Sequence, residues 1–145
     1  MARIMAFNTS LMSLDLSRKN IQDKEGAEIA RALFSNTTLR KLELESNCLG
    51  ASTAKHFAIV FKQNKTLRYL NLESNNLTND TEEMQGVDNM VNALAENTTL
   101  LSLNLADNRL SEEVGRNFVD LLNPRGRNQQ TLIDFEFGGS NTFRL

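Results

Sequence analysis

Few side chains in this sequence have the chemistry that catalysis or metal binding requires. His56 is the single histidine and Cys48 the single cysteine, so the chain offers neither a set of Cys and His zinc ligands nor a Cys-x-x-Cys pair. His56 is predicted to lie on the flank of a helix, and Cys48 to act as a small space-filling residue. A glycine-rich phosphate-binding loop is also missing from the sequence. We therefore expect no catalytic residue, no metal site and no cofactor.

A second group of candidate residues is the set of asparagines followed two positions later by Ser or Thr. Six such triplets occur, at Asn8, Asn36, Asn64, Asn76, Asn79 and Asn97. In a secreted protein they would be glycosylation acceptors. Four of them recur just before a predicted strand, which favours a turn motif in which the side chain bonds to nearby backbone. The single cysteine and an N-terminus without a long apolar signal segment agree with a cytoplasmic location.

The spacing of these asparagines reflects an internal repeat. Residues 38–47 and 66–75 are identical at eight of ten positions with an offset of 28. The pattern Leu-x-x-Leu-x-Leu-x-x-Asn-x-Leu begins at residues 11, 39, 67, 100 and 132. The first copy has Lys19 at the asparagine position, and the last copy has Ser140 there. Residues 1–145 are therefore predicted to form one repeat domain.

Each repeat predicts one short strand and one helix. Leu42 and Leu44 alternate with polar neighbours, which is the two-residue period of a strand. Apolar pairs four residues apart then mark a helix face, at Ile29 and Leu33, Phe57 and Phe61, Met90 and Leu94, and Phe118 and Leu122. Small residues at the start of three helices predict close approach of helix to strand; they are Gly26, Ala54 and Gly115. The asparagine that follows each strand is expected to satisfy backbone groups in a sharp turn.

Stacked copies of such a unit form a continuous core, since one strand and one helix cannot bury their apolar faces alone. The pattern resembles that of leucine-rich repeat proteins, and the 28-residue period with full helices resembles the ribonuclease-inhibitor-like class. The resemblance implies an α/β fold: a right-handed solenoid, or horseshoe segment, with a parallel sheet on the concave face and helices on the convex face. Within that class the Leu-Glu-Ser-Asn stretches are similar to those of the C-terminal repeat domain of tropomodulins and leiomodins.

The concave face is the predicted binding surface. Outward strand positions carry six acidic residues and one basic residue, and Arg40 and Arg68 lie at the strand starts. Such a stripe suits a protein partner with a basic segment, with Tyr69 as a central aromatic anchor; alternatively, the charges only keep an exposed sheet soluble. The predicted partner-binding residues are Asp15, Lys41, Glu43, Glu45, Tyr69, Asn71, Glu73, Asn104 and Asp107.

Composition limits the other partner classes. The formal charge is −2 and the isoelectric point is near 5.5, which disfavours nucleic acid and anionic membranes. No run reaches the roughly 20 apolar residues that a membrane-spanning helix needs. Two insertions, at residues 78–85 and 124–127, are interpreted as solvated loops, with binding as the alternative. Residues 1–7 align with the end of a preceding helix, and both end coils require cover from the chain itself or from a neighbouring segment or subunit.

The sequence leaves two alternative functions open. The resemblance to tropomodulins implies a regulator of actin filaments, although their separate actin- and tropomyosin-binding segments have no counterpart here. A regulator of a small GTPase is the other alternative, because GTPase-activating proteins of Ran have this type of repeat. The main prediction is a non-enzymatic module for protein–protein interaction.

Overall fold

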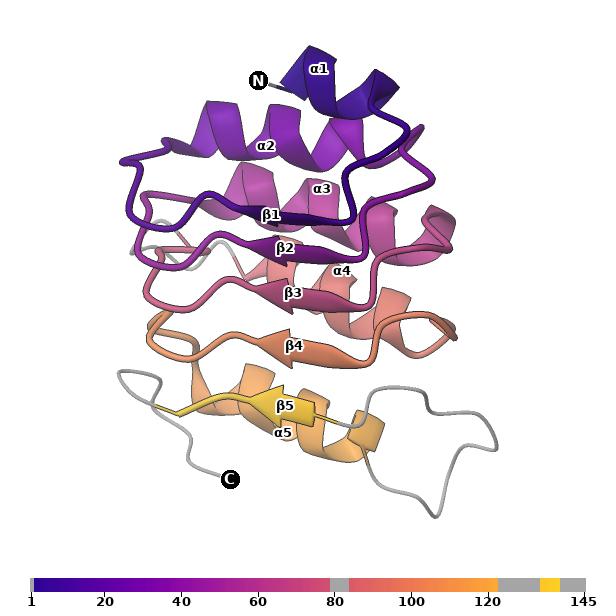
Figure 1. The fold of residues 1–145 in the computed structure, drawn as a ribbon. Coiled ribbons are helices and arrows are strands. Elements are labelled where there is room, and N and C mark those ends of the chain that lie inside the picture. Colours follow the sequence, from indigo (N-terminus) through magenta and orange to yellow (C-terminus); the bar gives the residue numbers. More distant parts are fainter. Residues whose placement is uncertain (1, 79–83, 123–133, 139–145) are drawn as a thin grey trace.

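The computed structural model describes residues 2–78, 84–122 and 134–138. In these ranges the chain alternates between helices and short strands (Figure 1). The elements are α1 (Ala2–Phe7), β1 (Ser13–Asp15), α2 (Asp23–Ala32), β2 (Lys41–Glu43), α3 (Ala51–Gln63), β3 (Tyr69–Asn71), α4 (Gln85–Leu94), β4 (Ser102–Asn104), α5 (Glu112–Leu122) and β5 (Asp134–Glu136). None of the helices in the described ranges has the length and apolar character that crossing a bilayer requires.

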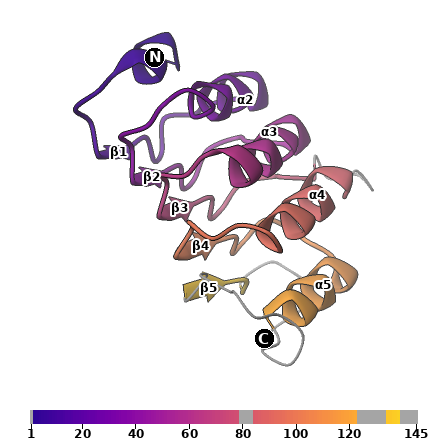
Figure 2. The same ribbon diagram turned by 90° about the vertical axis from the view of Figure 1, so that its right-hand side faces the viewer.

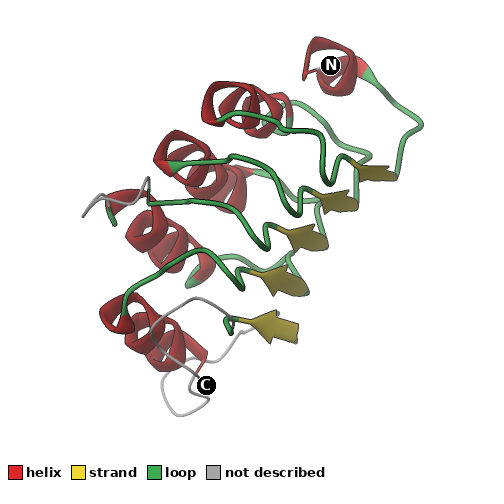
Figure 3. Ribbon diagram, turned by 90° about the vertical axis from the view of Figure 1, so that its left-hand side faces the viewer, coloured by secondary structure: helices red, strands yellow, loops and turns green. Residues whose placement is uncertain are grey.

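The five strands form one parallel sheet in the order β1-β2-β3-β4-β5. Figures 2 and 3 show the strands in one layer and the helices in a second layer beside it, and the loops of the described residues join the two layers. The register pairs equivalent repeat positions, so that Leu42 lies between Leu14 and Leu70. Leu103 and Phe135 continue this row on β4 and β5. The predicted stacking of the leucines in register is therefore confirmed.

The core lies between the two layers and consists of deeply buried apolar side chains. Leu42, Leu70 and Leu103 are at most 2% exposed, whereas Leu14, in the edge strand β1, is only partly buried. The predicted helix faces also lie inside, because Phe57, Phe61 and Phe118 are among the most deeply buried side chains. Phe118 stacks on Phe135 at a centroid distance of 4.7 Å, which joins α5 to β5. The side chain of Leu122, the partner of Phe118 in the predicted pair, is outside the described residues.

Small helix residues serve a different contact from the predicted one. A Cβ atom added to Gly26 would overlap side-chain atoms of Leu49 and Thr53, which belong to the next coil and its helix α3. At Gly86, an added Cβ would lie 2.9 Å from the carbonyl oxygen of Ala51 and 3.0 Å from the Cβ of Ala54 in α3. The prediction of helix-to-strand approach is thus wrong for Gly26: this residue lets neighbouring helices approach each other.

One set of asparagines joins each helix end to the coil before it. The Asn64 amide nitrogen donates to the carbonyl oxygens of Leu33 and Asn36, at 2.9 and 3.1 Å. Its side-chain oxygen accepts from the backbone N–H groups of Thr66 and Leu67, at 2.9 and 2.8 Å. Asn36 and Asn97 make equivalent bonds. All three are at most 6% exposed, so the turn interpretation of these triplets is confirmed.

A second set of asparagines follows the strands and acts in the same way. The Asn47 amide nitrogen donates to the carbonyl oxygens of Leu16 and Leu44, at 3.0 and 2.9 Å. Its side-chain oxygen accepts from the N–H groups of Lys19 and Ile21 in the preceding coil. Asn75 and Asn108 likewise donate to a strand-end carbonyl of the coil before and to one of their own coil. The predicted role of these asparagines in the turn is confirmed, and it extends across two coils.

A carboxylate supplies a further bond between coils. The helix α3 starts after Gly50, which has no side chain to cap it. Asp23 of the preceding coil accepts instead from the backbone N–H groups of Gly50, Ser52 and Thr53, at 2.9, 3.1 and 2.8 Å. Burial alone would raise the pKa of Asp23, but hydrogen bonds from the N–H and hydroxyl of Thr53 and from Ser52 and Gly50 outweigh it, so the pKa is lowered.

Replacing a helix-end asparagine is expected to destabilise the whole domain. Asn64→Ala leaves two buried carbonyls and two N–H groups without their partner, so the free energy of unfolding should fall by about 2–4 kcal/mol. Urea denaturation followed by circular dichroism measures this loss. Asn92→Ala, at an exposed position of α4, is the control and should change stability by less than about 0.5 kcal/mol. Equal stability of the two variants would contradict the proposed role of the asparagines.

Asp23→Asn is expected to remove a pH-dependent contribution to stability. Because the folded pKa lies below the ordinary value of 3.8, the Asp23 charge stabilises the fold at pH values above it, and this contribution is lost as the pH falls through the folded pKa. The variant should lose about 1–2 kcal/mol at neutral pH, and its difference from the parent should narrow below about pH 4. Denaturation curves at several pH values test this, with Asp120→Asn on the exposed side of α5 as a charge-matched control.

Candidate interaction face

The outward strand residues form three rows across the sheet, and together they are called the sheet face. The strand register aligns the first two rows, and backbone hydrogen bonds beyond the strand ends align the third. The first row is Ser13, Lys41, Tyr69, Ser102 and Asp134; the second is Asp15, Glu43, Asn71, Asn104 and Glu136; the third is Ser17, Glu45, Glu73, Ala106 and Gly138. These are the outward positions predicted from the repeat.

Eight of the nine predicted partner-binding residues lie in these rows. The structure therefore brings together Asp15, Lys41, Glu43, Glu45, Tyr69, Asn71, Glu73 and Asn104 on one surface. Asp107 lies beside the third row, in the turn after β4, where its N–H donates to the carbonyl oxygen of Gly138 at 3.1 Å. Its φ of 55° belongs to a turn conformation that is shared with Arg18, Ser46 and Ser74 at equivalent repeat positions.

Cations neutralise part of the acidic stripe at β1 and β2. The Lys41 ammonium lies 2.8 Å from Glu43, and the hydrogen bond and charge of Glu43 raise the pKa of Lys41, with Asp15 adding to the effect. The Arg18 guanidinium lies 3.0 Å from Glu45. Sequence reasoning missed Arg18, because only the positive φ of its turn (58°) brings this side chain to the sheet face. Its position directly after the third-row Ser17 was the available signal.

Carboxylates at β3 to β5 receive neutral donors instead. The Asn104 amide nitrogen lies 2.9 Å from Glu73 and 3.3 Å from Glu136, so one amide group links the two carboxylates. The Ser102 hydroxyl donates to Asp134 at 2.9 Å. Within the described part of the chain, these three carboxylates make no ion pair. The net negative charge of the sheet face is therefore concentrated around Glu73, Asp134 and Glu136.

The second row also has a local structural role. Side-chain oxygens of Asp15, Asn71 and Asn104 each accept, at 2.9 Å, from the backbone N–H two residues later. The pKa of Asp15 is lowered, mainly by the hydrogen bond from the backbone N–H of Ser17 and next by the hydrogen bond from the Ser17 side chain. The charges of Lys19 and Lys41 lower the pKa of Asp15 further. Glu43 and Glu136 differ from these three residues, because Glu43 pairs with Lys41 and Glu136 accepts from the Asn104 amide. Substitution of a short second-row side chain would therefore disturb a turn as well as the surface.

Tyr69 stands near the middle of the sheet face and is 46% exposed. It borders a hollow of about 190 Å³ that Glu43, Asn104 and Glu136 also line. A second hollow of about 580 Å³ lies beside it, over β1 and β2, and shares Lys41, Glu43 and Asn71 with the first. The sheet face is thus recessed and combines an accessible aromatic ring with carboxylates, which are the features predicted for a docking surface.

The sheet face is bordered by basic residues at the N-terminal ends of its central strands. Arg40 and Arg68 lie side by side at the starts of β2 and β3, where the N–H of Arg68 donates to the carbonyl oxygen of Arg40 at 2.8 Å. The Arg68 guanidinium also donates to the carbonyl oxygen of Thr99 at 2.8 Å. Both arginines and Lys65 border a hydroxyl-lined hollow of about 460 Å³. Positive charge thus gathers where β2 and β3 start, whereas Glu73 and Glu136 lie where β3 and β5 end.

Cys48 and His56, the single cysteine and histidine of the sequence, both lie outside the sheet face. Cys48 is exposed, with its sulfur 3.4 Å from the side-chain oxygen of Asn20, so the prediction of a space-filling cysteine is wrong. It is exposed because the turn after Asn47 lies outside the core. His56 is half-buried, and its Nδ1 is 2.8 Å from the carbonyl oxygen of Ser52 in its own helix. In the described ranges, no group of three or more His, Cys, Asp or Glu residues is arranged to hold a metal ion.

Both predicted insertions fall largely outside the described residues. Asp80, Glu82 and Glu83 of the first insertion and residues 124–127 of the second are not described. The described parts of the first insertion are Thr78, which is 2% exposed, Met84, which precedes α4, and Gln85, the first residue of α4. Binding by either loop stays a prediction.

Comparison with known proteins agrees with the repeat and the fold. The family profile described as leucine-rich repeat matches residues 35–58, 63–80 and 96–113, which contain β2, β3 and β4 with their asparagine turns. A solved structure of leiomodin-1 actin-binding site 2 is similar over 99% of this chain and 78% of its own, with a TM-score of 0.81 and 23% identity.

A tropomodulin C-terminal domain from Caenorhabditis elegans is similar over 97% of this chain and 82% of its own, with a TM-score of 0.77 and 14% identity. At these identities the two structures support the fold. No curated protein sequence matches the chain.

Proposed function

We propose that this chain, which the leucine-rich repeat profile matches over residues 35–58, 63–80 and 96–113, is a non-enzymatic interaction module that binds a protein partner on its sheet face. The observation that carries the proposal is the grouping of Glu73, Asp134 and Glu136, without contact cations in the described ranges, on the same surface as the half-exposed Tyr69. Carboxylates so placed give orientation and specificity, and an aromatic ring supplies contact area.

The charge distribution supports a partner with a basic segment. Lys or Arg side chains laid over the strand ends would meet Glu73 and Glu136, whereas the strand starts present Arg40 and Arg68 and would repel them. Because of this difference in charge, the basic segment is expected to occupy the part of the sheet face where the strands end. A nucleic acid is disfavoured as the partner, because its phosphates would face the carboxylates.

We also assign the chain to the ribonuclease-inhibitor-like class and to the cytoplasm. The 28-residue spacing and helices of 10–13 residues in α2 to α5 support the class. The exposed, unpaired thiol of Cys48 supports a reducing compartment, since such thiols persist there.

Reversing the charge of the third-row residues Glu45 and Glu73 and of the second-row residue Glu43 tests the proposal. The triple variant Glu43→Lys, Glu45→Lys, Glu73→Lys is expected to abolish capture of a basic partner from an extract of the native source, because it replaces three of the six carboxylates of the sheet face by ammonium groups. These glutamates make no turn bond of the second-row type, so circular dichroism and the melting temperature should stay close to those of the parent. Mass spectrometry identifies the captured proteins.

The matched control reverses three carboxylates on the helix side. Glu96→Lys, Glu113→Lys and Asp120→Lys change the net charge by the same amount at exposed positions of the helix layer. A partner of the sheet face is a protein that the control variant retains and the sheet-face variant loses. Retention of the same proteins by both variants would contradict the proposal and move the binding surface elsewhere.

A second candidate is regulation of actin filaments. The supporting observation is the similarity in fold to the leiomodin-1 structure, whose title names an actin-binding site. If this function applies, the chain should co-sediment with filamentous actin and slow elongation at pointed ends. Absence of both effects at concentrations that saturate a leiomodin control would exclude this candidate and leave the interaction module in place.

A further inference from the structure

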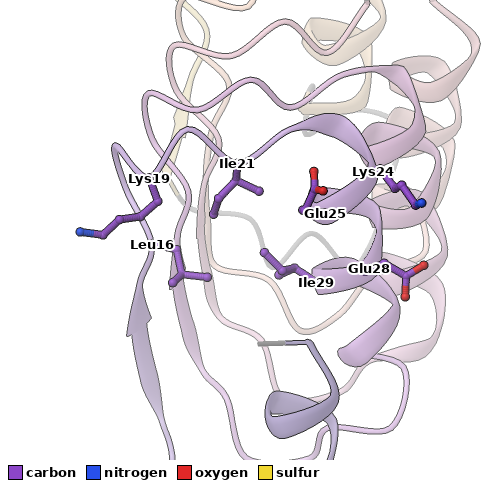
Figure 4. Close-up of a pocket in the computed structure, with 7 residues that line it drawn as sticks. All are labelled: Leu16, Lys19, Ile21, Lys24, Glu25, Glu28 and Ile29. Atoms are coloured by element: carbon purple, nitrogen blue, oxygen red, sulfur yellow. The ribbon is translucent and has the colours of Figure 1, made fainter.

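The first coil has an incomplete cover. The helix α1 spans only six residues, and the Asn36 amide bonds to the carbonyl oxygens of Met5 and Asn8, so α1 lies against the C-terminal half of α2. A hollow of about 550 Å³ lies between the N-terminal half of α2 and the end of β1 (Figure 4). Leu16, Ile21 and Ile29 form its apolar floor, and its remaining lining residues are Lys19, Lys24, Glu25 and Glu28.

The next coil shows that this surface is equivalent to a coil-to-coil contact. The residues equivalent to Leu16, Ile21 and Ile29, 28 positions later, are Leu44, Leu49 and Phe57, and all three are fully buried. In the first coil Leu16 and Ile29 are 6% and 4% exposed, and Ile21 is only partly buried. The first turn of α2 covers Leu49 of the next coil, because Gly26 packs against Leu49 and Thr53. The hollow is therefore a coil-to-coil contact surface whose covering helix turn does not occur in the described residues.

The end of the solenoid carries a ridge and a groove side by side. The ridge is α1, which lies over one half of α2 (Figure 1). The groove is the hollow over the other half of α2. Two large apolar side chains are exposed at the same end: Phe7 at 79%, at the end of α1, and Met12 at 51%, just before β1. A twofold axis through this end would place the ridge of each copy in the groove of the other, and would bring the two β1 edges together in antiparallel pairing.

We propose that two copies of this chain dimerise through this end, with α1 of each copy covering the hollow of the other. The charges support a second copy as the occupant: the rim carries two lysines and two glutamates, so its net charge is zero and it does not repel itself. A small apolar ligand would cover the floor of the hollow but leave Phe7 and Met12 in water. A second copy covers both, and it also protects the free edge of β1.

Sedimentation equilibrium of the 145-residue chain tests the proposal. The parent is expected to show a concentration-dependent dimer, and Phe7→Glu and Met12→Glu should each raise the dimer Kd by at least about tenfold, because each buries a charge in the interface. Both residues are exposed in the single copy, so the fold should survive, as circular dichroism would verify. Ile59→Glu, at a 38% exposed position of α3 away from this end, is the matched control and should leave the Kd unchanged.

Three outcomes would overturn the proposal. The first is a parent that stays monomeric at its highest soluble concentration. The second is a dimer that both Phe7→Glu and Met12→Glu leave intact. The third is a dimer that Tyr69→Glu disrupts and the two N-terminal variants do not, since this would place the contact on the sheet face. None of these outcomes depends on the binding of another protein, so the dimer is tested separately from the proposed function.

Discussion

Hydrogen bonds between coils are the constraint on which this structure depends. A coil of 28 residues buries backbone groups in its turns that it cannot satisfy itself, and the asparagine of the next coil supplies the missing partners. Asn47 bonds to the backbone of Leu16, Lys19 and Ile21, and Asn64 does the same for Leu33 and Asn36. Because both ends of the strand-bearing segment are fixed to the preceding coil, neither the register nor the length of that segment can change in one coil alone, and the two insertions fall outside it.

This arrangement separates the residues that stabilise the fold from most of those that face a partner. The leucines and asparagines carry the stability from inside the coils, so first-row and third-row side chains are free to differ between strands. Lys41, Tyr69 and Ser102 are neighbours in one row and have unrelated chemistry. The second row is less free, because Asp15, Asn71 and Asn104 also hold the turn that follows their strands. Specificity is therefore expected to reside mainly in the first and third rows.

The sequence predicts whatever the repeat lattice determines. Alternation of Leu42 and Leu44 with polar residues identifies the inward and outward positions, and equal spacing then aligns them across the sheet. Contacts that depend on a turn conformation or on the reach of a side chain are not encoded in that period. Arg18 meets Glu45 only because its φ is positive, and Asp23 caps a helix 28 residues later. Cys48 was misplaced for the same reason, since small size predicts burial and only the turn geometry places it outside.

The first coil combines features of an inner coil and of a surface. An asparagine at position 19 would direct its amide toward an earlier coil, as Asn47 does toward Leu16; the sequence has Lys19 there, a charged group at the rim of the hollow. An end that faced only water would also carry a polar residue at position 21, yet the partly buried Ile21 keeps the apolar character of its equivalent Leu49. A polar rim around an apolar centre is the composition of a protein–protein interface, so the departure at Lys19 and the retention of Ile21 have one common explanation.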